Sequence, residues 1–143
     1  MLVLFITGTA FSQDYRSRIY EKKKQYISEK INLTENQKDK FWSLYEEYNN
    51  KKKDLRVELS QNKLDLRKST ISEKEVQEII QKDFSIKQEF VTLEKEYVNK
   101  YSKILTNEQL VALLNAEEDF HKIMMERIRE HKKKKELSDD NSQ

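Results

Sequence analysis

Residues 33–37 of the chain read Leu33-Thr34-Glu35-Asn36-Gln37, and residues 105–109 read Leu105-Thr106-Asn107-Glu108-Gln109. A third, related stretch is Ile71-Ser72-Glu73-Lys74-Glu75. Each stretch has an apolar residue, then Ser or Thr, then Gln or Glu three residues later, which is the pattern of a capping box. In that box the hydroxyl accepts from the N3 backbone amide, and the N3 side chain accepts from the N-cap backbone amide. The three stretches therefore predict three helix starts.

These caps divide the chain into four predicted helices. We place them at about Tyr15–Ile31, Glu35–Lys68, Glu73–Ile104 and Asn107–Glu136. Apolar residues recur at helical spacing within them, most regularly in the third. The chain has one Gly, no Pro and no Cys, whereas tight β-hairpins depend on Gly, Asn and Asp. The expected fold class is all-α.

The length of the second and third helices decides the expected architecture. A helix of about 34 residues is a rod of roughly 50 Å, so two such helices form a thin, elongated antiparallel hairpin. A thin hairpin buries one stripe per helix and is marginal alone, so a homodimer would supply the missing burial. Phe84, Val91 and Val98 recur every seven residues beside the main stripe. They fit either a coiled-coil seam of that dimer or the edge of a wide core face.

The first eleven residues, MLVLFITGTAF, carry no charge and are mostly apolar. This run is too short to span a bilayer, which takes about 20 apolar residues. Ala10-Phe11-Ser12 reads as a small-x-small cleavage site, so we expect a signal peptide over residues 1–12 and export of the mature chain from Gln13. No Lys or Arg precedes the run, and the alternative is a buried N-terminal strand or helix turn.

The remainder is expected to be one helical domain over residues 13–131 and a charged tail over residues 132–143. The tail is a basic run followed by an acidic and polar end, a composition typical of disorder. No segment of the mature chain is apolar enough to span a membrane.

The composition disfavours a nucleic-acid-binding protein and an enzyme. The chain has 28 Lys and Arg against 26 Asp and Glu, a mixed surface unlike the strong basic field of a nucleic-acid binder. It has two His and no Cys, no Gly-rich loop that could cradle phosphate and no nucleophile elbow. We therefore expect a protein that is not an enzyme, with no cofactor and no nucleic-acid partner.

The sequence Leu-Thr-x-x-Gln occurs twice, at residues 33–37 and 105–109, where it opens the second and fourth predicted helices. With these two copies in a small exported chain, the protein resembles the Spy/CpxP LTxxQ family of periplasmic proteins. The resemblance covers about residues 15–130 in helix order and motif placement. The chain also resembles the short exported proteins of Bacteroidetes that are often labelled sensors of ECF-type sigma factors, which have a signal end similar to Ser12-Gln13.

The resemblance implies a cradle-shaped, antiparallel helical dimer in the bacterial envelope. Some members of the family are ATP-independent chaperones that hold unfolding clients on a concave, basic and apolar face. Others repress an envelope-stress sensor kinase, and a third branch senses heavy metals. Thr34, Gln37, Thr106 and Gln109 carry over from the family as helix caps and not as catalytic residues. The full set of predicted capping-motif residues is Leu33, Thr34, Gln37, Ser72, Glu75, Leu105, Thr106 and Gln109.

A candidate client-binding surface lies on the second helix, where cationic and aromatic residues are neighbours. Its residues are Phe41, Trp42, Tyr45, Tyr48, Lys51, Lys52 and Lys53. The charges would attract an unfolded chain from a distance, and the aromatic side chains would then bind it. The alternative is a solvated helix face balanced by Glu.

A weaker candidate is a metal site formed by Glu117, His121 and Met125, which share one helix face at i, i+4 and i+8. Imidazole and thioether ligands suit copper or nickel, but two or three ligands make a weak site. The alternative is a surface His near a core Met.

The leading functional hypothesis is an exported ATP-independent chaperone or envelope-stress adaptor whose partners are unfolded or dedicated polypeptides. A second hypothesis is a regulatory sensor that represses a membrane anti-sigma factor or sensor kinase. A third is heavy-metal binding or sensing.

Overall fold

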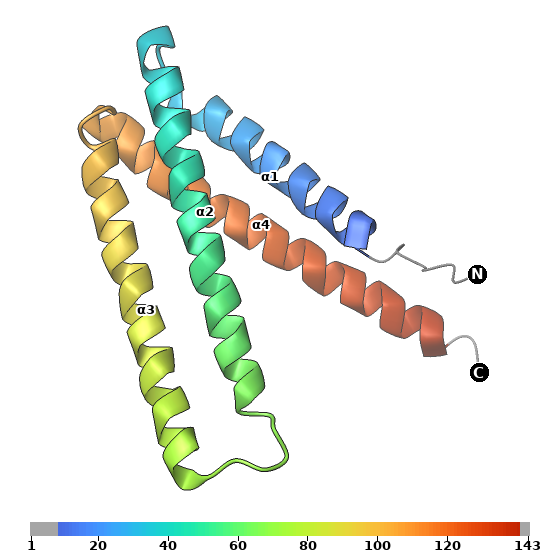
Figure 1. The fold of residues 1–143 in the computed structure, drawn as a ribbon. Helices are drawn as coiled ribbons and strands as arrows, with labels where there is room; N and C mark the ends of the chain where they lie inside the picture. Colours follow the sequence, from blue (N-terminus) through green and yellow to red (C-terminus); the bar gives the residue numbers. More distant parts are fainter. Residues whose placement is uncertain (1–8, 141–143) are drawn as a thin grey trace, which may run out of the picture. The chain divides into compact units, whose positions relative to one another are not determined.

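The computed structural model describes the backbone of residues 9–140 and the side chains of residues 17–137. Over that part of the chain it contains helices and no strands (Figure 1). The helices are α1 (Thr9–Ile31), α2 (Glu35–Asp65), α3 (Glu73–Tyr101) and α4 (Asn107–Asp140). The all-α prediction is confirmed. Most of the predicted signal peptide, residues 1–8, lies outside the described residues, and α1 begins at Thr9 within its last part.

The chain forms two compact units. One unit is residues 34–107, which contain α2 and α3, and the other combines the described parts of residues 1–33 and 108–143, which contain α1 and most of α4. Within the first unit, α2 and α3 run antiparallel and side by side (Figure 1). We call this first unit the hairpin.

The core of the hairpin is a cluster of aromatic rings at the start of α2 and the end of α3. The Phe41 and Tyr101 rings lie 5.5 Å apart between centroids, and Tyr48 stacks on Tyr97 at 4.9 Å. These four side chains and Tyr45 are buried. Each buried aromatic side chain removes a large apolar area from water, and neighbouring rings attract one another. A few such side chains therefore supply much of the stabilisation of a thin core.

The opposite part of the hairpin, toward the turn, is held by polar contacts as well as by apolar ones. Asn62 of α2 is buried, and its side-chain Nδ2 donates to the backbone carbonyl oxygen of Ile79 in α3 at 2.9 Å. Further along α3, Ile86 is also buried. Lys82 of α3 forms an ion pair with Glu58 of α2 at 3.3 Å. A buried amide is stabilising only when it is hydrogen-bonded, as Asn62 is.

In the second unit, α1 and α4 contact each other through a short apolar and ionic interface. The rings of Tyr26 and Phe120 lie 5.8 Å apart, and Lys23 forms an ion pair with Glu117 at 2.6 Å. Buried apolar side chains on both helices belong to this unit. They are Ile27, Ile31, Leu113, Ala116 and Phe120.

The predicted starts of α2, α3 and α4 are confirmed to the residue. The clearest capping box is that of α3, where Ser72 N–H donates to Glu75 Oε2 at 2.8 Å and Glu75 N–H donates to Ser72 Oγ at 3.3 Å. Hydrogen bonds from the Ser72 hydroxyl and backbone lower the pKa of the Glu75 carboxyl. The cap is therefore strongest when Glu75 is ionised.

The predicted ends of α2 and α3 are three residues too late. α2 ends at Asp65 and not at Lys68, and α3 ends at Tyr101 and not at Ile104. After Tyr101 the chain tightens into a turn in which the Tyr101 carbonyl accepts from the amides of both Ile104 and Leu105, at 2.9 and 2.8 Å. The spacing of apolar residues does not show where such a backbone turn begins. The prediction based on that spacing therefore ended the helix too late.

The prediction of a disordered tail from residue 132 is wrong for the residues that the structure describes. α4 continues through the basic run to Asp140. Lys, Glu and Leu are good helix formers, and a helix already nucleated upstream extends at little cost.

We expect Ser72→Ala to lower the unfolding free energy by about 0.5–2 kcal/mol at neutral pH, because it removes the hydroxyl that accepts from the Glu75 amide. The folded pKa of Glu75 is depressed, so its contribution is present above the unfolded pKa and is lost as the pH falls through the folded pKa. Part of the difference between the two proteins should therefore disappear in acid. Urea unfolding followed by circular dichroism measures both effects.

Ser60→Ala is the matched control, because Ser60 is exposed in the interior of α2, where alanine is the better helix former. Equal destabilisation by both substitutions would contradict the capping role of Ser72.

Candidate functional site

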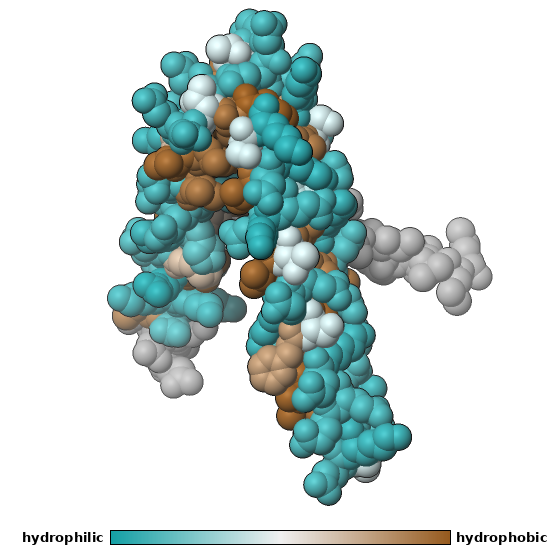
Figure 2. Space-filling model, turned by 90° about the vertical axis from the view of Figure 1, so that its left-hand side faces the viewer, coloured by the Kyte–Doolittle hydropathy of each residue, from teal (hydrophilic) through white to brown (hydrophobic). Residues whose placement is uncertain are grey.

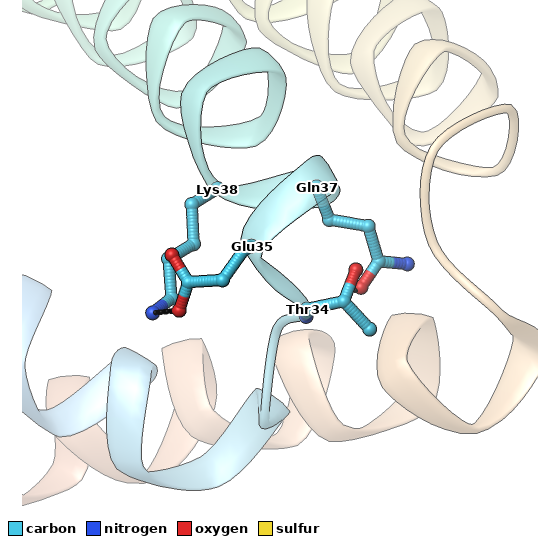
Figure 3. Close-up of polar contacts among 4 residues, drawn as sticks. All are labelled: Thr34, Glu35, Gln37 and Lys38. Carbon is cyan, nitrogen blue, oxygen red and sulfur yellow. Dashed lines mark hydrogen bonds and ion pairs between the residues drawn. The ribbon is translucent and has the colours of Figure 1, made fainter.

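Gln37 uses both ends of its side-chain amide. Its Oε1 accepts from the Thr34 backbone N–H at 3.0 Å, within the capping box of α2 (Figure 3). Its Nε2 donates to the Ile104 carbonyl oxygen at 2.9 Å, just beyond the end of α3. In the same turn Lys38 forms an ion pair with Glu35. One glutamine thus caps α2 and ties its start to the end of α3.

Gln109 makes the equivalent bond in the other unit. Its Nε2 donates to the carbonyl oxygen of Asn32 at 3.2 Å, one residue beyond the end of α1. Asn32 has a φ of 46°, a left-handed conformation that Asn tolerates and that ends α1. Asn32 directly precedes Leu33, and Ile104 directly precedes Leu105. Each glutamine therefore binds the residue before the leucine of the other motif copy.

The difference between glutamine and glutamate explains why only two of the three boxes make this bond. Glu75 accepts at the cap of α3, but an ionised carboxylate has no N–H to donate. Sequence reasoning treated the three boxes alike and missed the cross-helix bond of Gln37 and Gln109. The available signal was the amide at these two positions.

The aromatic part of the predicted client-binding surface lies in the core. Phe41, Tyr45 and Tyr48 are buried, with 0%, 1% and 9% of their surfaces exposed. Trp42 is half-buried, and its ring packs against Phe41 at 4.9 Å and Tyr45 at 5.3 Å. The prediction that Phe41, Tyr45 and Tyr48 form an exposed surface is wrong, since all three are buried and Phe41 and Tyr48 pack on Tyr101 and Tyr97 of α3.

The three lysines of the same prediction do not form one patch. Consecutive helical residues point about 100° apart, so Lys51, Lys52 and Lys53 face three directions. Lys51 forms an ion pair with Glu47 at 3.0 Å, and the neighbouring Tyr97 and Glu47 side chains raise the pKa of its ammonium group. Lys52 lies over the Tyr48 ring at 4.8 Å, while Lys53 is exposed.

An exposed apolar row lies instead on α3. Phe84 and Val91 are seven residues apart on one face of the helix and are 61% and 59% exposed, and Val98 continues the line half-buried. The interpretation of this line as part of a wide core face is therefore wrong for Phe84 and Val91. We call Phe84, Val91 and Val98 the α3 row. Figure 2 shows apolar side chains exposed within a mainly hydrophilic surface on the side of the molecule that includes α3.

Cations flank the α3 row. Lys87 forms an ion pair with Asp83, and its Nζ lies 5.7 Å from the centre of the Phe84 ring. Lys95 is exposed one turn beyond Val91 on the same side of the helix. The combination of basic and apolar side chains that the sequence predicted for α2 is thus realised on α3.

The three predicted metal ligands differ in their surroundings. Glu117 is engaged with Lys23 at 2.6 Å, whereas His121 and Met125 are exposed on α4. Over the residues that the structure describes there is no group of three or more His, Cys, Asp or Glu side chains that could hold a metal ion.

We expect Gln37→Glu to lower the unfolding free energy by about 1 kcal/mol, because the carboxylate keeps the acceptor at the cap but loses the donor to Ile104. A negative charge at a helix start is itself favourable, so a net loss reflects the missing bond. Gln109→Glu should behave in the same way through Asn32. Chemical denaturation measures each change.

Glu75→Gln serves as the comparison, since it also interconverts amide and carboxylate in a capping box, without a cross-helix partner. If Gln37→Glu is as stable as the parent protein, the bond to Ile104 contributes no more than the favourable charge that the carboxylate brings to the helix start.

Titration calorimetry with nickel, copper or zinc should show weak binding only, because His121 and Met125 offer two ligands and Glu117 would have to leave Lys23. Tight binding that His121→Ala abolishes would contradict this expectation and establish a metal site on α4.

Among the described helices, none combines the length and apolar character needed to cross a membrane. Comparison with curated proteins and with solved structures gives no match. The family model described as LTXXQ motif family protein matches the chain over residues 19–117. This range runs through both motif copies and the whole hairpin between them. By its motifs, its helix order and this match, the chain belongs to the LTXXQ motif family.

Proposed function

We propose that the protein is an exported, ATP-independent chaperone or envelope-stress adaptor, and not an enzyme, that binds unfolded or partner polypeptides on the α3 row. The observation that carries this proposal is the exposure of Phe84 and Val91 on a long, capped helix. Export rests on the apolar N-terminal segment and its small-x-small end at Ala10-Phe11-Ser12.

The α3 row offers an unfolded chain an apolar surface against which its own exposed apolar side chains can be buried. Burying an exposed Phe or Val side chain is worth about 1.5–3 kcal/mol, so a few such contacts give useful but reversible binding. The row is long and shallow, which suits extended or helical segments better than a small molecule. Membership of the LTXXQ motif family agrees with a binding role, since its motifs cap helices and supply no reactive group.

The cations beside the row would act at longer range. Exposed Lys95 would attract acidic stretches of a client before apolar contact is made, and Lys87 would do so by exchanging its partner Asp83 for the client. This attraction is screened by salt, with a Debye length of about 8–10 Å at physiological ionic strength. The absence of a Gly-rich phosphate loop from the sequence supports the ATP-independent form of the proposal.

A dedicated regulatory partner is the second candidate, and the seven-residue spacing of the α3 row supports it. That spacing matches the repeat by which one helix pairs with another, so the row suits one helix of a membrane anti-sigma factor or sensor kinase. A second copy of the chain would satisfy the same row, as a homodimer. The three occupants differ in stoichiometry and in breadth of specificity.

The test measures suppression of aggregation of two unrelated unfolding substrates, without ATP. The parent protein should protect both, and Phe84→Ser combined with Val91→Ser should weaken protection about tenfold or more, through the lost apolar burial. Lys87→Glu combined with Lys95→Glu should mainly slow capture. Val57→Ser is the matched control, because Val57 is 62% exposed on α2 and lies outside the row.

Absence of protection by the folded parent protein would end the chaperone proposal and favour the dedicated partner. Sedimentation of the parent and the Phe84→Ser, Val91→Ser protein tests the homodimer in parallel. A dimer that this double substitution dissociates would make the row a subunit interface and contradict its role in client binding.

A further inference from the structure

A groove runs along one side of the hairpin, separate from the α3 row. Its volume is about 570 Å³, and it is lined by residues of α2 and α3. The lining residues are Lys51, Asp54, Leu55, Glu58, Ser85, Gln88, Glu89, Thr92, Leu93 and Glu96. Ser85 and Thr92 each follow a residue of the α3 row by one position, which turns them about 100° away from it.

The groove exists because small and polar side chains replace large apolar ones at this part of the helix contact. Ser85, Gln88 and Thr92 are exposed on the α3 wall, and the Thr92 hydroxyl is bonded to its own helix at the Gln88 carbonyl, 3.0 Å away. Leu55 and Leu93, one from each helix, are half-buried and provide apolar surface inside the groove. The groove therefore has an apolar base and polar walls.

The charge of the walls is mainly negative. Among the lining residues, four are carboxylates, Asp54, Glu58, Glu89 and Glu96, against Lys51 alone. Lys51 is already paired with Glu47, outside the groove, at 3.0 Å.

Two of these carboxylates are already neutralised by lysines outside the lining. Glu58 pairs with Lys82 at 3.3 Å and Glu96 pairs with Lys100 at 2.7 Å. Asp54 and Glu89 have no ion-pair partner among the described residues. They stand on opposite helices, so the groove presents an uncompensated carboxylate from each wall.

We propose that this groove binds a cationic, apolar segment of polypeptide, one with Lys or Arg beside leucine-like side chains. The apolar side chains of the segment would cover Leu55 and Leu93, and its cations would reach Asp54 and Glu89. Between Ser85 and Glu96 the α3 wall is about 16 Å long, room for roughly five residues of extended chain. The inference rests on the proposed function in taking polypeptide as the ligand, and it adds a second site with the opposite charge preference.

The choice of a polypeptide over a small cation follows from the base of the groove. A metal ion or a polyamine would use the carboxylates and leave the leucines wet, whereas a peptide with both kinds of side chain uses both. The charge balance likewise disfavours an acidic segment, which Asp54 and Glu89 would repel.

The test uses the full-length protein and fluorescein-labelled peptides of alternating leucine and lysine, with a leucine and glutamate peptide of equal length for comparison. Fluorescence anisotropy should show saturable binding of the lysine peptide and at least tenfold weaker binding of the glutamate peptide. Asp54→Asn combined with Glu89→Gln should weaken binding about fivefold or more. Thr92→Lys, which adds bulk and positive charge at an exposed helical position, should have the same effect.

Asp39→Asn combined with Glu94→Gln is the control, because both residues are exposed carboxylates of α2 and α3 outside the groove. Equal loss in the control and the groove protein would mean unspecific charge attraction and would overturn the inference. So would equal binding of the two peptides.

The outcome is separable from that of the proposed function. Protection of aggregating substrates without lysine-peptide binding removes the groove site and leaves the proposed function standing. Lysine-peptide binding that the Asp54 and Glu89 substitutions weaken, without any protection, keeps the groove site and removes the chaperone.

Discussion

Two helices lying side by side can bury only one face of each, and this limit governs the hairpin of α2 and α3. The apolar contact is concentrated in the rings at one end, where Phe41 and Tyr48 meet Tyr101 and Tyr97. Elsewhere the contact is thin enough to leave a groove between the helices. With so little apolar area available, hydrogen bonds at the helix ends gain importance relative to burial. The amide of Gln37, which caps one helix and reaches the end of the other, adds a directional bond of about 1 kcal/mol to the packing of the rings at that end.

The same limit accounts for the exposed surfaces on which we propose that polypeptides bind. A helix with only one covered face keeps the rest of its surface in water, and on α3 that remainder includes the large side chains of Phe84 and Val91. The two sides of α3 differ in kind. One carries apolar side chains beside lysines, and the other forms the wall of a groove with unpaired carboxylates. A single hairpin thereby presents two surfaces of different charge without a separate domain for either.

The starts of α2, α3 and α4 could be predicted from the sequence because capping is local: a hydroxyl, three residues and an amide or carboxylate determine it. The start of α1 was predicted wrongly, at Tyr15 and not at Thr9, because no such capping motif precedes it. The helix ends could not, since the turn after Tyr101 is built from backbone bonds that any residues could make. The site was predicted less well than the fold. Phe41 and Tyr45 were recognised as a set, but spacing alone does not say whether a stripe faces a neighbouring helix or water. The α3 row was found by its seven-residue spacing, while its exposure and the groove depend on how α2 and α3 meet.

The buried amide of Asn62 has a mechanical consequence for the hairpin. Its bond to the Ile79 carbonyl fixes one helix against the other in the axial direction. Sliding by a single helical turn, about 5.4 Å, would carry that carbonyl out of reach and leave the buried amide without its partner. At the other end the buried rings and the bond from Gln37 to Ile104 hold the two helices together. The alignment of α2 and α3 is thus fixed near the turn and their separation is held at the far end, so a polypeptide on this hairpin would have to fit a surface of set register and width.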